Sequence, residues 1–197
     1  MDGWIPKEEQ DKLRGAAPCL FLSWEASWRD HLRLIGEFVD KTKVAGKWLQ
    51  TYDKKVAEIR DSFPSELKTD KMLVVHVYHN DIGVWGRLAG TVLYDDLRLQ
   101  PASGLQEFPW TKSVQVTQLA EFEADRLIVN ISKDSLSQAT WVDITKGAAW
   151  RELTAVKNGK VHITPGYAGW ESPWNEHAAF NCERLLQQFA LLFDPSM

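Results

Sequence analysis

The sequence predicts an α/β fold: a single small three-layer lobe with a mostly parallel sheet, preceded by a long helix. Three observations predict it. Apolar residues recur at helical spacing through residues 28–63, the longest helical pattern in the chain. Residues 72–77 form a nearly continuous apolar run, as expected of a parallel strand covered on both faces. Beyond this run, strand-like and helix-like segments alternate up to residue 193, which favours right-handed crossovers between parallel strands.

The amino-terminal third is predicted to be mainly helical. A short helix begins after Pro6, with acidic residues in its first turn, and residues 18–23 predict a short buried strand. The long helical pattern is interrupted only lightly at residues 41–42 and ends before Pro64. Its predicted inward-facing residues are Trp28, Leu32, Ile35, Val39, Val44, Trp48, Tyr52, Val56, Ile59 and Phe63.

The remaining elements are expected to follow one another with short connections. They are a helix at 84–97, a loop at 101–109, a short helix at 116–122, a strand at 126–131, helical turns at 148–153, a strand at 160–163 and a last helix from near Pro173.

The composition is that of an ordinary globular chain and excludes several classes of function. The 197 residues carry a net charge of −4, and no basic tract forms a footprint for nucleic acid. The sequence has no nucleophile elbow, phosphate loop, HExxH or CxxC motif, so we predict no catalytic residue, no metal site and no enzyme activity. His76, His79 and Asp81 are the best metal alternative, but strand-end histidines with ordinary partners are the simpler interpretation. The ten tryptophans favour a site that stacks planar ligands.

Cysteine usage and the start of the sequence bear on compartment. Cys19 and Cys182 are predicted to be free thiols, which favours a reducing environment. The first residues lack the basic and apolar regions of a signal peptide. We therefore expect a cytoplasmic location, with an extracytoplasmic, membrane-anchored lipoprotein as the alternative.

Four segments, in order, carry a resemblance to a known family. They are APCL at 17–20 with WRDHLRLIG at 28–36, GTVLYDDLRL at 90–99, QVTQLAEFEADRLIV at 115–129, and WRELTAVKNGKV at 150–161. Together they resemble the carboxy-terminal half of the periplasmic binding proteins of the iron-siderophore and cobalamin class. Such modules occur in siderophore receptors and fused to AraC-type regulators.

The resemblance implies two α/β lobes joined by a helical backbone, with the ligand in the cleft between them. It assigns residues 1–24 to the tail of the first lobe and the strand that leads into the helix, residues 25–63 to the lobe-connecting helical segment, and residues 64–197 to the carboxy-terminal lobe. The missing amino-terminal lobe of the same module is then an expected partner, and a half-formed cleft should bind its ligand poorly.

The ligand site is expected beyond the carboxyl ends of the parallel strands. The candidate ligand-binding residues are Tyr78, Asn80, Trp85, Arg87, Trp110, Lys112, Trp170 and Trp174, with His79, Asp81 and Tyr167 beside them. Aromatic faces would stack on catechol groups, and the two cations would offset the negative charge of a ferric chelate. The alternatives are loop packing for the tryptophans and solvated charges for Arg87 and Lys112.

Two functions remain open, both non-catalytic and both without a cofactor. The first is the effector-sensing domain of a cytoplasmic AraC-type regulator, with a ferric siderophore as the possible ligand and DNA bound only through a domain outside this chain. The second is a lobe of an iron-siderophore transport receptor. Family members that feed a transporter carry a glutamate that docks on the permease where this chain has Thr117, which favours the regulator. No segment predicts a membrane span.

Overall fold

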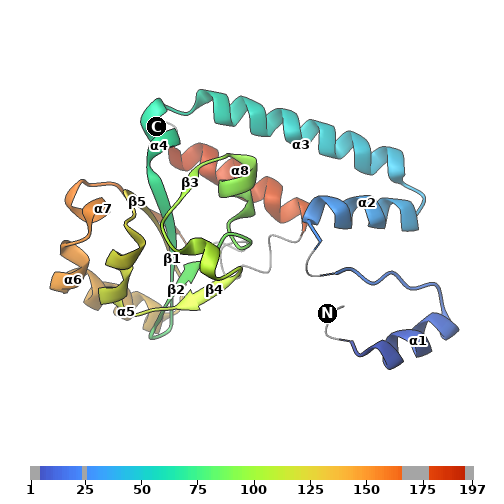
Figure 1. Ribbon diagram of the computed structural model, residues 1–197, viewed down its shortest axis with the longest axis horizontal. Helices are drawn as coiled ribbons and strands as arrows, with labels where there is room; N and C mark the ends of the chain where they lie inside the picture. Colours follow the sequence, from blue (N-terminus) through green and yellow to red (C-terminus); the bar gives the residue numbers. More distant parts are fainter. Residues whose placement is uncertain (1–4, 24–25, 166–177, 194–197) are drawn as a thin grey trace.

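The fold is built on a mixed sheet whose central strands are almost entirely apolar. The computed structural model describes residues 5–23, 26–165 and 178–193 (Figure 1). Its strands are β1 (Lys71–Tyr78), β2 (Asp81–Trp85), β3 (Gln100–Pro101), β4 (Thr111–Ser113), β5 (Arg126–Ile131) and β6 (Val161–Pro165). The sheet order is β4-β2-β1-β5-β6, with β3 beside β1. Among these strands only β2 runs against the others, which confirms the predicted mostly parallel α/β lobe.

Helices cover both faces of this sheet. The helical elements of the described residues are α1 (Lys7–Ala16), α2 (Trp28–Phe38), α3 (Thr42–Ser62), α4 (Ser65–Thr69), α5 (Ser135–Lys146), α6 (Ala148–Arg151), α7 (Thr154–Lys157) and α8 (Ala179–Phe193), with the π-helix η1 (Val92–Asp96) and the 3-10 helices η2 (Leu105–Glu107) and η3 (Val116–Phe122); α1 lies apart from the sheet (Figure 1). Figure 1 shows α5, α6 and α7 on one side of the sheet and α3 and α8 on the other. Burial of β1 between these layers leaves the side chains of Met72, Leu73 and Val74 with no exposed surface.

The segment predicted as one nearly continuous helix is a pair of helices, α2 and α3, that fold back on each other (Figure 1). The chain reverses at Asp40, which has a positive φ of 54°. The helices approach so closely that a Cβ on Gly36 would lie 2.8 Å from the Cβ of Ala45. The reversal turns Val39 and Val44, both predicted to face inward, outward, with 52% and 64% of their surface exposed.

The predicted helix at 84–97 is wrong in its first half. Residues 81–85 are strand β2, which pairs with β1 in a hairpin, and only η1 is helical. Val84 and Trp85 are both fully buried, so this strand is apolar on both faces. Such a short apolar run fits a helix and a strand equally well, and the sheet decides between them.

Two further predictions need correction. Residues 18–23 form no strand, and none of the strands in the described residues pairs with them. The predicted burial is also incomplete, because residues 19–23 are only half-buried. Helix α5 was not predicted, because its serines and threonines give a weak helical signal. Asp134 was the available clue, since its carboxylate caps the helix by accepting from the backbone N–H of Ser137. The predicted start of the last helix near Pro173 lies outside the described residues.

A buried carboxylate ties the α2–α3 pair to the lobe. Asp96, at the end of η1, accepts a hydrogen bond of 2.7 Å from the Tyr52 hydroxyl and pairs at 2.8 Å with a guanidinium nitrogen of Arg29. Arg29 also lies over the Trp28 ring, 4.3 Å from its centroid. Burial raises the pKa of Asp96 above its ordinary value, and the hydrogen bonds from Tyr52 and Arg29 oppose that effect.

The variant Asp96→Asn should therefore lower the free energy of unfolding by about 2–3 kcal/mol, because it leaves Arg29 without its buried counter-charge. The matched control is Asp53→Asn, which removes the exposed partner of the same guanidinium and should cost less than about 1 kcal/mol. Urea unfolding of both variants measures the difference. If the two variants lost the same free energy of unfolding, the buried pair of Arg29 and Asp96 would have no special role in stability.

Candidate ligand-binding site

The turn after β2 lies against the segment that leads into β4. The backbone N–H of Gly86 donates to the carbonyl of Trp110 at 2.5 Å, and that of Leu88 donates to the carbonyl of Pro109 at 2.9 Å. Gly86 is required there, because a Cβ would lie 2.3 Å from the carbonyl oxygen of Phe108. Strand pairing places Trp85 opposite Thr111. The backbones that carry Arg87 and Trp110 are therefore held side by side.

Three of the predicted ligand residues gather on these segments. The Arg87 side chain is 59% exposed and forms an ion pair of 2.9 Å with Asp95 of η1. Lys112 projects from the exposed strand β4, and its ammonium lies 5.8 Å from the centroid of the Phe108 ring. Trp110 is half-buried. Two cations and an indole carried on adjoining segments can bind an anionic, aromatic ligand through charge, hydrogen bonds and ring stacking.

Tyr78 and Asn80 lie elsewhere, at the carboxyl end of β1. The Tyr78 ring is half exposed and contacts the ring of His79 at 4.0 Å, and Asn80 accepts a hydrogen bond from Thr140 of α5. Strand β2, five residues long, separates this end from Arg87 by roughly 16 Å. The side chains of Tyr78, Asn80 and Arg87 do not share a loop, because residues 81–85 form strand β2, which runs back along β1 where a helix was predicted.

Trp85 is a core residue with no exposed surface, so its ring cannot stack on a ligand in this structure. The predicted contacts Trp170 and Trp174, and the neighbouring Tyr167, lie outside the described residues. His76 contacts the Ser132 hydroxyl at 3.0 Å, the ordinary kind of partner that the sequence suggested. Within the described ranges, no three histidine, cysteine or acidic side chains group as a metal site would require.

An apolar groove of about 340 Å³ opens where α2, α3 and the start of α8 meet. The sequence pattern does not predict this groove, because the groove depends on the reversal at Asp40. Among its apolar lining residues, Val44 and Phe180 are the most exposed, with 64% and 67% of their surface accessible. Its full lining is Leu32, Ile35, Gly36, Val39, Lys41, Val44, Ala45, Trp48, Ala179 and Phe180. Such a surface is typical of a protein interface.

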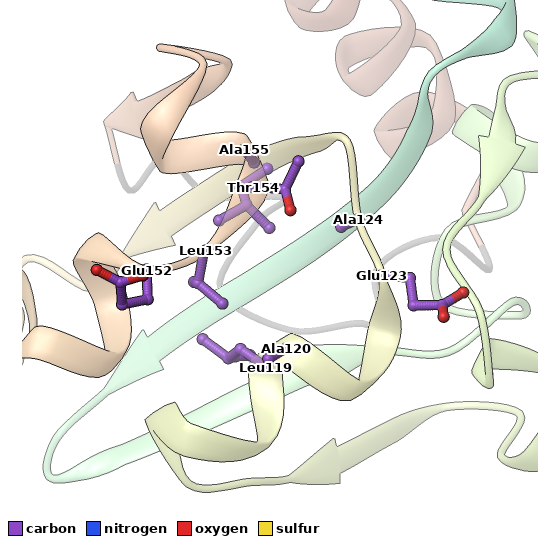
Figure 2. Close-up of a pocket in the computed structure, with 9 residues that line it drawn as sticks. Leu119, Ala120, Glu123, Ala124, Glu152, Leu153, Thr154 and Ala155 are labelled. Carbon is purple, nitrogen blue, oxygen red and sulfur yellow. The ribbon is translucent and has the colours of Figure 1, made fainter.

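A smaller cavity lies between η3 and the α6–α7 turn (Figure 2). It measures about 70 Å³ and is lined in part by Leu119, Leu153 and Ala155. Ligand pockets usually enclose roughly 300–1,000 Å³, so this cavity is too small for a chelate. The neighbouring Thr117 is exposed on η3.

A comparison of the sequence with protein families matches residues 2–168 to the family described as periplasmic binding protein. The chain belongs to the periplasmic binding protein family. This confirms the resemblance drawn from the four sequence segments. The family consists of ligand-binding proteins, and the observed sheet and its covering helices match a lobe of that fold.

Two curated relatives within this family come from Bacillus subtilis (strain 168). The HTH-type transcriptional activator Btr is 25% identical over 185 residues, covering 93% of this chain and 34% of the relative. The iron-uptake system-binding protein is 23% identical over 164 residues, covering 81% of this chain and 52% of the relative. The chain thus spans about half the length, or less, of these curated relatives.

Among solved structures, the triscatecholate siderophore binding protein FeuA from Bacillus subtilis, complexed with ferri-bacillibactin, is similar in fold. The TM-score is 0.68 at 21% identity, covering 96% of this chain and 70% of FeuA. Among the described residues, no helix combines the length and the apolar character that crossing a membrane requires.

The variant Gly86→Ala should destabilise the lobe by about 1–3 kcal/mol, because the new methyl group would meet backbone atoms that cannot move aside. The control Gly46→Ala, in α3, has open space around its Cβ and should stabilise the protein by about 0.5–1 kcal/mol. Chemical unfolding measures both. An unchanged free energy of unfolding in Gly86→Ala would show that the turn is not closely packed.

Proposed function

We propose that this chain is a non-catalytic lobe that binds an anionic ferric chelate of the siderophore type, and that it serves as the effector-sensing domain of a cytoplasmic AraC-type regulator. The observation that supports the ligand class is the grouping of Arg87, Lys112 and Trp110 on the adjoining β2 and β4 segments. The cations offset the charge of the chelate, and the indole stacks on its rings. FeuA, whose fold is similar, is a triscatecholate siderophore binding protein.

The regulator role is supported by two observations. The match to the activator Btr extends over 93% of this chain. The exposed position on η3 that carries a permease-docking glutamate in transporter-feeding members is Thr117, which has no charge to offer a permease arginine. In this role ligand binding shifts the population of lobe arrangements that a DNA-binding domain outside this chain responds to.

A transport receptor is the second candidate, because the iron-uptake system-binding protein matches 81% of this chain. In that role the lobe would be extracytoplasmic and anchored to the membrane by a lipid. Both roles use the same ligand site. They differ in what the lobe contacts after the ligand is bound.

In either role the complementary lobe of the module is the expected occupant of the apolar groove on α2, α3 and α8. The groove is lined almost wholly by carbon, and residues 19–22, in the segment before α2, are apolar but only half-buried. FeuA extends beyond the aligned region by about a third of its length. A complementary lobe would cover both surfaces and supply the second wall of the ligand cleft.

Tryptophan fluorescence titration of the full-length protein, with both lobes present, against a trianionic ferric tris-catecholate tests the ligand class. We expect saturable quenching, and Arg87→Ala should weaken binding by about 1–3 kcal/mol, roughly 5- to 150-fold, through the loss of a charge-assisted hydrogen bond. The control Arg33→Ala removes an exposed arginine of α2 and should leave the affinity unchanged. If no ferric chelate binds saturably, the proposed ligand class is wrong.

The coding sequence next to this chain decides between the two roles. A regulator predicts a helix-turn-helix region in the same reading frame, and a receptor predicts a signal sequence followed by a lipid-attachment cysteine. If the frame encodes a helix-turn-helix region, the ferric chelate should also change operator binding by the full-length protein. A signal sequence in the frame would rule out the regulator.

A further inference from the structure

We propose that Asp95 sets the charge selectivity of the ligand site, by acting as an internal counter-ion that an anionic ligand must displace from Arg87. This inference rests on the proposed function, because it takes Arg87 as a ligand contact. It assigns a role to a residue of η1, outside the β2 and β4 segments, in setting the affinity of the site for anionic ligands.

In this structure Asp95 pairs with the Arg87 guanidinium, which is the group that an anionic ligand would bind. A guanidinium nitrogen of Arg87 lies 2.9 Å from a carboxylate oxygen of Asp95, and the two side chains are 59% and 38% exposed. The pair is therefore reachable from solvent. A carboxylate of the ligand, or a catecholate oxygen, would compete with Asp95 for the same N–H groups.

The backbone that carries Asp95 is held in place. Residues 92–94 of η1 are buried beneath it, and the Tyr94 hydroxyl donates to the carbonyl of Met72 in β1. The next residue, Asp96, is fixed by Tyr52 and Arg29. Asp95 thus stands on an anchored π-turn, a helical irregularity that often occurs at functional sites.

The Asp95 carboxylate affects the affinities for charged and neutral ligands differently. An anionic chelate loses affinity twice, because it displaces the internal partner of Arg87 and remains close to a carboxylate of like charge. A neutral chelate does not experience this repulsion. Arg87 and Lys112 alone would favour anionic over neutral chelates. Asp95 reduces that difference in affinity, because its carboxylate is an unfavourable contact for the anion only.

The test compares Asp95→Asn with the wild type, both as the full-length protein with two lobes, in fluorescence titrations against two probes, a trianionic ferric tris-catecholate and a neutral ferric trihydroxamate. Because an exposed ion pair is weak, we expect Asp95→Asn to bind the anionic probe about two- to five-fold more tightly. The dissociation constant for the neutral probe should change by less than about 1.5-fold, and the gain in affinity for the anionic probe should shrink at high salt.

The matched control is Asp143→Asn, which removes an equal charge from an exposed ion pair with Lys146 on α5. It should leave the affinity for both probes unchanged. In an Arg87→Ala background the gain from Asp95→Asn should fall well below its value in the wild type, because the displaced partner is gone.

Each result decides a separate point. If the wild type binds the anionic probe and Asp95→Asn matches Asp143→Asn, the inference is overturned and the proposed function stands. Equal gains for the anionic and the neutral probe also overturn it. If the wild type binds neither probe, the proposed function fails, and the role of Asp95 fails with it.

Discussion

The buried carboxylate of Asp96 is the constraint on which the arrangement of this chain depends. It receives the Tyr52 hydroxyl and the Arg29 guanidinium, and so joins both helices of the α2–α3 pair to the π-helix of the lobe. A carboxylate this deeply buried is costly unless it is paired, so the contact allows one docking of the helices. That docking also holds the backbone of the neighbouring Asp95, whose carboxylate pairs with the side chain of Arg87.

Two surfaces of opposite character follow from this arrangement. The turn that carries Arg87 and the edge strand that carries Lys112 form a polar, cationic region suited to a charged ligand. The groove between α2, α3 and α8 is apolar and suited to protein. A lobe that binds a chelate against a second lobe needs both, because the ligand requires charge and donors whereas the lobe contact requires burial.

The sheet was predicted from the sequence much better than the neighbours of the candidate ligand residues were. The apolar runs at 72–77 and 126–131 are long enough to indicate buried parallel strands, and both are strands. Val84 and Trp85 misled the prediction, because a short apolar segment fits a helix and a strand equally well. That error placed Arg87 near Tyr78 and gave Trp85 a ligand role. The pairing of Arg87 with Asp95 has no signal in the sequence, since eight residues and a turn separate them.

The sequence by itself determined the family, the α/β class and the absence of recognisable catalytic motifs, because these depend on local patterns and on short segments in a fixed order. Only the tertiary structure decided which side chains meet. It reversed the helix at Asp40, turned residues 81–85 into a strand that returns along β1, and thereby brought Arg87 beside Trp110 instead of Asn80. The physical reason is that helix reversal and strand pairing are settled by burial against distant segments, which a linear pattern does not record.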